Sequence, residues 1–175
     1  MPSKKEKIIE TALKLFAEEG FNTTSTSRIA REAGVSEGLI FRHFKNKHGL
    51  LNAIQKMADI KIQSLYAEIL KEEDPKELIR KAIDMGSELI RSKEDQQIWK
   101  LRYKMKWESE DFREFRIFPL QDALESAFRK LGYRKPDLEA RLFTMTFDGL
   151  ATRLFLTDSI NLDEYLDYMK TRYQV

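Results

Sequence analysis

The sequence predicts an all-α protein in which a small three-helix head precedes a larger helical bundle. Apolar residues recur with a helical period along most of the 175 residues, and no run shows the period of two that strands require. Glycine and proline are sparse, with 7 and 4 copies, so few residues interrupt the periodic stretches. We expect about nine helices, with residues 1–46 as the head and residues 47–175 as the bundle.

The three helices of the predicted head are short. Gly20 and Gly34 are suited to end the first and second helix, because glycine adopts the left-handed conformation of a helix end without strain. Thr26 and Ser36 are the expected N-caps of the second and third helix, since their hydroxyl oxygens can accept from free helix amides. The expected ranges are about Ser3 to Glu19, Ser27 to Ala33 and Glu37 to Phe44.

Six further helices are expected in the bundle. Pro75 and Pro136 mark helix starts, where the missing amide of proline has no cost. Pro119 is expected inside a helix, which it would kink or split. Asn161 or Ser159 is expected to cap the last helix. The expected ranges are about 47–71, 75–92, 94–107, 110–131, 136–157 and 162–173.

Composition excludes several classes of protein. There is no cysteine, which excludes disulfides, cysteine-ligated zinc and thiol catalysis. The two histidines, His43 and His48, would lie on different faces of a helix and so do not suggest a metal site. Neither an HExxH motif nor a glycine-rich phosphate loop is present, so we expect no enzyme activity and no cofactor. Without a long apolar run or a signal peptide, a cytoplasmic protein that does not contact a membrane is expected.

Charge is distributed unevenly along the chain. The net charge is +2, but residues 1–50 hold nine Lys or Arg and six Glu. The remaining residues hold 22 basic and 23 acidic side chains and are close to neutral. The asymmetry is small and permits a nucleic-acid partner for the head without requiring one.

Residues 26–44, TSRIAREAGVSEGLIFRHF, have the form of a helix-turn-helix. In this motif the second helix enters the major groove of DNA, so its exposed positions meet bases or phosphates. Arg42 is suited to bind guanine through two hydrogen bonds, and Gly38 allows a close approach of the backbone. Lys45 and Lys47 flank the start of the next helix, where free amides favour a phosphate. These generic features also fit an ordinary helical hairpin with a solvated charged face.

Three stretches follow one another with a specific pattern. The first, 9-IETALKLFAEEGF-21, fits I-x-x-A-x-x-L-F-x-x-x-G-F/Y, with Ile8 giving the usual spacing. The second, Thr26 to Ser36, fits T-x-x-x-I-A-x-x-A-G-V-S with one residue fewer before Ile29. The third, 38-GLIFRHFKNKHGLL-51, fits G-x-[IL]-[YF]-x-[HY]-F-x-[ND]-K-x-x-L. In order and spacing, these stretches resemble the TetR family of bacterial transcriptional regulators.

The resemblance implies a homodimeric, repressor-type regulator. Its head would bind double-stranded operator DNA, and its C-terminal part would bind a small effector and dimerise. Many family members have Tyr in place of Phe41, and the Tyr hydroxyl commonly contacts a phosphate, a bond that Phe41 cannot donate. By position, the implied DNA contacts are Thr26, Arg28, Glu37, Gly38, Leu39, Phe41, Arg42, His43 and Lys47, and Lys45 joins them from its place before the fourth helix.

The stretch 98-IWKLRYKMKWESEDFREFRIF-118 is rich in aromatic residues. Trp99, Tyr103 and Trp107 recur every four residues and therefore share a helical face. One interpretation is an apolar effector cavity with a few polar anchors, and the other is the core of the bundle. The family resemblance favours contact of one or two of these side chains with a ligand. The candidate effector-binding residues are Trp99, Arg102, Tyr103, Trp107, Phe115 and Met145.

The last two predicted helices are the candidates for dimerisation. Apolar residues cover more than one stripe of the stretch 137–156, so that helix must be buried on more than one side. Gly149 would permit close helix approach, and in the family the last two helices pair with those of a second copy. The alternative is an internal core helix of a monomer. The candidate interface residues are Leu142, Met145, Gly149, Leu150, Arg153, Leu154, Tyr165 and Met169.

The sequence therefore favours a ligand-responsive DNA-binding repressor. A small, largely apolar effector would bind the C-terminal part and change the spacing of the two heads, so that they no longer match a palindromic operator. The alternative is a protein-interaction adaptor that has kept the helix-turn-helix but does not bind an operator. The steep salt dependence of DNA binding separates the two.

Overall fold

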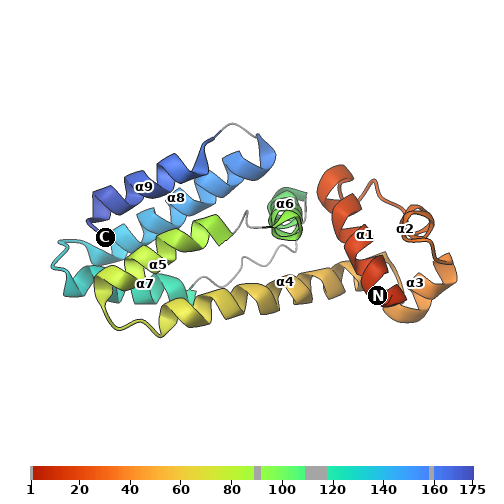
Figure 1. The fold of residues 1–175 in the computed structure, drawn as a ribbon, viewed down its shortest axis with the longest axis horizontal. Coiled ribbons are helices and arrows are strands. Elements are labelled where there is room, and N and C mark those ends of the chain that lie inside the picture. Colours follow the sequence, from red (N-terminus) through yellow and green to blue (C-terminus); the bar gives the residue numbers. More distant parts are fainter. Residues whose placement is uncertain (1, 89–91, 109–117, 158–159) are drawn as a thin grey trace. The chain divides into compact units, whose positions relative to one another are not determined.

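The computed structural model describes residues 2–88, 92–108, 118–157 and 160–175, with the side chains of 106–108 and 118 left aside. These ranges contain nine helices and no strand (Figure 1), which confirms the all-α prediction. None of the helices in these ranges is long and apolar enough to cross a membrane. The helices are α1 (Lys4–Glu19), α2 (Thr26–Ala33), α3 (Glu37–Phe44), α4 (Lys47–Leu70), α5 (Pro75–Glu88), α6 (Lys93–Glu108), α7 (Phe118–Lys130), α8 (Pro136–Leu156) and α9 (Leu162–Tyr173).

Contacts between residues divide the chain into two compact units. The N-terminal unit comprises Met1–Ile62 and Gln97–Glu110, and the C-terminal unit comprises Gln63–Gln96 and Asp111–Val175. Helices α4 and α6 therefore contribute residues to both units. This division describes packing. The expected boundary between residues 46 and 47 concerns roles in binding and stays a prediction.

The N-cap of α2 differs from the one expected. Ser25, not Thr26, occupies the cap position, and its hydroxyl oxygen accepts a hydrogen bond from the backbone amide of Arg28 at 3.2 Å. Thr26 is the first residue of the helix, so its hydroxyl is available for a contact elsewhere. Ser36 lies at the expected cap position of α3 but makes no side-chain capping bond.

Pro119 is the second residue of α7, where a missing backbone amide is tolerated. The kink or split expected at Pro119 also concerns the residues before 118, which lie outside the described residues. The expected start of this helix near residue 110 and the expected end of α5 near residue 92 involve segments outside the described residues. Asn161 occupies the N-cap position of α9 without a side-chain bond, and the alternative cap, Ser159, is also outside the described residues.

The core of the N-terminal unit forms between one stripe of α1 and the inner faces of α2, α3 and the start of α4. Phe16 is fully buried, and its ring meets that of Phe21 edge-on with the centroids 5.2 Å apart. The residue that follows Gly20 thus packs back on the end of α1. Other fully buried side chains of this core are Ile8, Leu13, Ile29, Ile40, Leu50 and Ile54.

Helices α5, α7, α8 and α9 lie together in the C-terminal unit (Figure 1). Their buried side chains form its core, which Ile69 of α4 joins. The ring of Phe128 from α7 lies 5.2 Å from that of Tyr173 in α9, and the ring of Phe143 from α8 lies 5.7 Å from the same tyrosine. Gly86 of α5 lies against the side chains of Leu166 and Phe147. The approach is so close that a Cβ atom at Gly86 would be 2.8 Å from Leu166 Cδ2. The absence of a side chain at Gly86 therefore sets how closely α5 approaches its neighbours.

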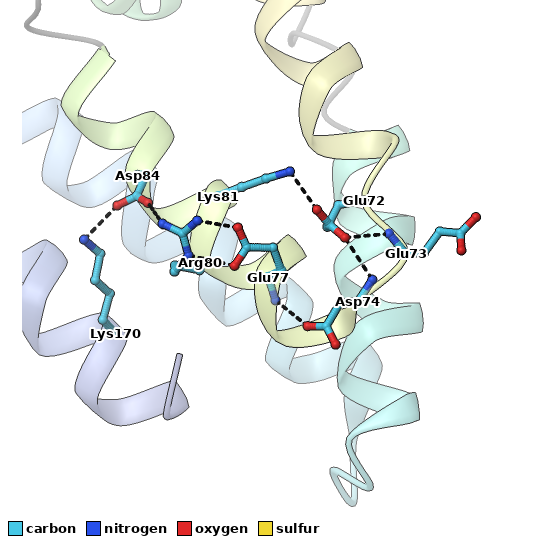
Figure 2. Close-up of polar contacts among 8 residues, drawn as sticks. All are labelled: Glu72, Glu73, Asp74, Glu77, Arg80, Lys81, Asp84 and Lys170. Carbon is cyan, nitrogen blue, oxygen red and sulfur yellow. Dashed lines mark hydrogen bonds and ion pairs between the residues drawn. The ribbon is translucent and has the colours of Figure 1, made fainter.

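An ion-pair network fastens α5 at the surface of the C-terminal unit (Figure 2). Asp84 lies between two cations: it pairs with Arg80 of the same helix and with Lys170 of α9, each at 2.7 Å. One turn away, Lys81 pairs with Glu72 in the turn between α4 and α5 at 2.7 Å. The network therefore ties α5 to the preceding turn and to the last helix.

Candidate nucleic-acid interface

A tight turn orients α2 and α3 as a helix-turn-helix. Gly34 ends α2 with φ at 66°, in the left-handed region where glycine is unstrained. Its amide donates to the carbonyl oxygen of Arg31 at 3.2 Å, and the amide of Val35 donates to that of Ala30 at 2.9 Å. These bonds satisfy the last carbonyl groups of α2 and fix the direction in which α3 begins.

Helix α3 has one buried face and one exposed face. Ile40 and Phe44 are buried, at 0% and 6% exposure, and anchor the helix to the core. Phe41 is 46% exposed although it is aromatic, and Leu39 is half-buried. The expected base-reading residues that lie fully on the exposed side are Gly38, Phe41, Arg42 and His43.

The first residues of α2 and α3 are joined directly. The hydroxyl of Thr26 donates to Oε1 of Glu37 at 2.6 Å, and both side chains are half-buried. A bond of this kind between a hydroxyl and a carboxylate is short and strong. Two residues expected to contact DNA are therefore held together in the free protein.

Arg28 is held by an acidic residue of α1. Its guanidinium lies 2.8 Å from the carboxylate of Glu19, with the two side chains 41% and 34% exposed. The Nε atom of Arg28 is buried without a hydrogen-bond partner. A phosphate contact by Arg28 would thus share the guanidinium with Glu19 or displace it.

The two lysines at the start of α4 differ in their surroundings. Lys45 is exposed and adopts a left-handed φ of 69° between the helices. The ammonium of Lys47 instead donates to the carbonyl oxygens of Phe21, Asn22 and Thr24, at 2.9, 3.4 and 3.1 Å. Because a lysine has three N–H donors, the expected phosphate contact of Lys47 competes with three bonds inside the protein.

Part of the aromatic segment lies on α6 within the N-terminal unit. Trp99, Arg102 and Tyr103 are all half-buried. Arg102 lies 3.7 Å from the carboxylate of Asp59 in α4 and 5.9 Å from the centroid of the Trp99 ring. Nearby, Lys104 donates to the carbonyl oxygen of Glu18, near the end of α1, at 2.9 Å. The α6 segment thus contacts both α1 and α4.

The remaining effector candidates do not join this group. The side chain of Trp107 and the whole of Phe115 fall outside the described residues. Met145 lies on the surface of α8 with 66% of its area exposed. The expectation that Met145 faces an interior cavity is therefore wrong for this chain, and its exposure fits the other role expected for it, at a surface between copies.

Exposed apolar side chains form a stripe along α8, which we call the α8 stripe: Leu138, Leu142, Met145 and Leu156. The first three follow at spacings of four and three residues, and Leu156 lies eleven residues after Met145, close to three full turns, so all four share one side of the helix. Gly149 continues the same spacing, and a Cβ atom added there would meet no other atom within 4 Å. On α9, Tyr165 and Tyr168 are 45% and 65% exposed. Sequence analysis had not selected Leu138, Leu156 or Tyr168.

Three other interface candidates lie differently. Leu150 and Met169 are buried in the core of the C-terminal unit, at 7% and 4% exposure. Leu154 is half-buried and packs against that core. Placing Leu150 and Met169 on an outer surface was wrong, because they face the other helices of their own chain. Arg153 is exposed, as expected.

The head matches a known protein family. Residues 8–54, which include both helices of the helix-turn-helix, match the family described as bacterial regulatory proteins, tetR family. Residues 8–54 of this chain are therefore of the TetR-family type. The match covers the region in which sequence analysis found the family pattern.

Curated relatives of this chain include transcriptional regulators of the HTH type. One is the uncharacterized HTH-type transcriptional regulator YerO of Bacillus subtilis, 36% identical over 104 residues. That alignment covers 54% of this chain and 34% of YerO, so the chain spans about a third of the length of this relative.

Solved structures resemble the whole fold. NalD of Pseudomonas aeruginosa, the secondary repressor of a multidrug efflux pump, has a TM-score of 0.72 at 20% identity and covers 98% of this chain and 93% of its own. AibR, solved in complex with isovaleryl coenzyme A and operator DNA, has a TM-score of 0.72 at 18% identity and covers 97% of both chains. At such low identity, these similarities show that this chain shares their fold and nothing beyond it.

Proposed function

We propose that this chain is a DNA-binding transcriptional regulator that acts as a homodimer. The observation that carries the proposal is the exposed face of α3, where Phe41, Arg42 and His43 stand opposite two buried anchors in a TetR-family head. Arg42 would bind guanine in the major groove. Gly38, Leu39 and His43 would contact the same groove, and Lys45 a phosphate.

The role proposed for Lys47 is to position the head rather than to bind a phosphate. Its three bonds to carbonyl oxygens of the α1–α2 turn leave it no free donor. Arg28, which has a partner within the head, would contact the DNA backbone next to the groove. Thr26 would do so only through its backbone amide, because its one hydroxyl donor is used by Glu37.

The homodimer would form through the α8 stripe with Tyr165 and Tyr168 of α9. Exposed apolar side chains gathered on one side of a helix are costly in water unless another surface covers them. A second copy is the proposed cover because two heads are needed to read a two-fold operator. Gly149 and Arg153 would lie within this contact.

A small, largely apolar effector would release the protein from its operator, which makes it a repressor. The residues proposed to respond are Trp99, Arg102 and Tyr103, because α6 carries them and also contacts α1 and α4. AibR, which shares this fold, was solved with both isovaleryl coenzyme A and operator DNA. That complex supports the proposal that a protein of this fold can bind a small molecule as well as an operator.

Selection of random duplexes by the purified chain tests the proposal. At two salt concentrations, the wild-type protein should enrich one palindrome, with lower affinity at higher salt because bound counterions are released. Arg42→Ala should lose most of the enrichment, whereas Arg134→Ala, which removes an equal charge from an exposed position of the C-terminal unit, should keep it. No enrichment at either salt would overturn the proposal and favour the adaptor.

A further inference from the structure

Glu37 has an unusual position for an acidic residue in a DNA-reading helix. It is the first residue of α3, and in a helix-turn-helix the N-terminal residues of the second helix meet the base edges. Phosphates repel a carboxylate, so the group in the groove that would attract Glu37 is a donor on a base. Among the described residues, Thr26 is its one hydrogen-bond partner, and no cation neutralises it.

The chemistry of the major groove narrows the possible donors to two. An ionised carboxylate accepts hydrogen bonds and donates none. Only the N4 amino group of cytosine and the N6 amino group of adenine offer a donor there. Adenine places its N7 acceptor beside N6, which repels a carboxylate, whereas cytosine presents only the donor. Cytosine is therefore the base that a carboxylate selects.

We propose that Glu37 selects cytosine at one position of each operator half-site and that Thr26 holds it in the orientation to do so. This inference rests on the proposed function. The 2.6 Å bond from Thr26 occupies Oε1 and leaves Oε2 to accept from the base. Because Thr26 is the first residue of α2, the bond fixes the carboxylate to a second helix and limits the rotamers it would otherwise sample.

The test compares the operators selected by the full-length wild-type protein and by two isosteric variants. Glu37→Gln replaces the acceptor with an amide, which pairs best with adenine N6 and N7. Glu32→Gln is the matched control, since it removes the same charge from an exposed position of α2 and leaves Glu37 intact. The wild-type protein should prefer cytosine by roughly tenfold at one position of each half-site, as expected for one mismatched pair. Glu37→Gln should move that preference to adenine, and Glu32→Gln should leave it unchanged.

A third variant tests the role of Thr26. Thr26→Val keeps the shape of the side chain but removes the hydroxyl, so cytosine should remain preferred with reduced discrimination, while the other operator positions keep theirs. Equal discrimination by Thr26→Val and wild type would overturn the positioning role.

The outcomes separate this inference from the proposed function. A palindrome that Glu37→Gln and Glu32→Gln select identically would overturn the cytosine assignment alone, because operator binding would stand. The cytosine assignment would also be overturned if Glu37→Gln changed the base preference only at a position where the wild-type protein does not prefer cytosine. No enriched palindrome from the wild-type protein would overturn both proposals.

Discussion

Lys47 and Phe21 are joined twice: the Lys47 ammonium donates to the Phe21 carbonyl oxygen at 2.9 Å and lies 4.4 Å from the centroid of its ring. The ring of His48 also meets that of Phe21 edge-on, with the centroids 5.0 Å apart. The turn that follows α1 is therefore fixed to the start of α4, and the two segments are expected to move together within the N-terminal unit.

The first prediction separates the two lysines at the start of α4. Lys47→Met should lower the free energy of unfolding by about 2 kcal/mol, because it removes charge-assisted hydrogen bonds to the turn. It should leave the salt dependence of operator affinity unchanged. Lys45→Met should keep stability and reduce the slope of log affinity against log salt by about 1.8, the effect of two lost phosphate contacts, one from each subunit of the dimer. Thermal unfolding and titrations at several salt concentrations measure both. A shallower slope for Lys47→Met with unchanged stability would assign it to a phosphate instead.

The second prediction concerns the surface between copies. The double variant Leu142→Glu with Met145→Glu should convert a dimer to a monomer, because four charges would meet in one apolar contact. Ile60→Glu is the control, since Ile60 of α4 is 62% exposed and lies outside the α8 stripe. Sedimentation equilibrium gives the mass of each. A double variant with the mass of the wild-type dimer would rule out the α8 stripe as the interface.

The third prediction tests the close approach of α5. Gly86→Ala should destabilise the C-terminal unit by about 1–3 kcal/mol, because the new Cβ would lie 2.8 Å from Leu166 Cδ2 and 2.9 Å from Phe147 Cε1. Combined with Leu166→Ala, it should cost less than the sum of the two single changes, since the smaller side chain makes room. Chemical denaturation of the four proteins measures the coupling. A gain in stability from Gly86→Ala would mean that better helix propensity outweighs the contact.

The fourth prediction is acid sensitivity of the C-terminal unit. The hydrogen bond from Lys81 holds the pKa of Glu72 below its ordinary value of 4.5, and the bond from Arg80 does the same for the pKa of Glu77. Each carboxylate therefore binds a proton more readily in the unfolded chain. The contribution of each carboxylate to stability is complete above pH 4.5 and is lost as the pH falls through the lowered pKa.

Glu72→Gln with Glu77→Gln should thus be less stable than the wild type at neutral pH, and the difference should shrink as the pH falls below 4.5. Glu164→Gln, an exposed glutamate of α9 outside the network, serves as the control. The melting temperatures of the three proteins, measured from neutral pH to below pH 4.5, provide the test. A difference that stays constant with pH would speak against the ion pairs as its source.

The sequence predicted the fold well because its signals are local. Gly20 and Gly34 mark helix ends through their own backbone freedom, and the periodic stripes identify the helices between them. The cap of α2 was misassigned because Ser25 and Thr26 are adjacent and both carry a hydroxyl that can cap. Only the folded structure shows that the hydroxyl of Thr26 donates to Glu37, which leaves the hydroxyl of Ser25 to cap the helix.

The parts that sequence could not predict depend on contacts between distant residues. Nothing near Lys47 in the chain indicates that its ammonium meets carbonyl groups more than twenty residues away. Helix α8 is apolar on more than one side, and periodicity cannot tell which side its own bundle covers. For that reason Leu150 was placed outside, while Leu138 and Leu156 were overlooked.

The most direct test of the central claim is a hydroxyl-radical footprint of the full-length protein on its selected duplex. Two heads of one dimer should protect two half-sites whose centres are about 10 base pairs, or one helical turn, apart. Arg42→Ala should abolish both footprints together. A single protected half-site, or uniform protection without a pattern, would contradict the claim that this chain reads its operator as a two-fold pair.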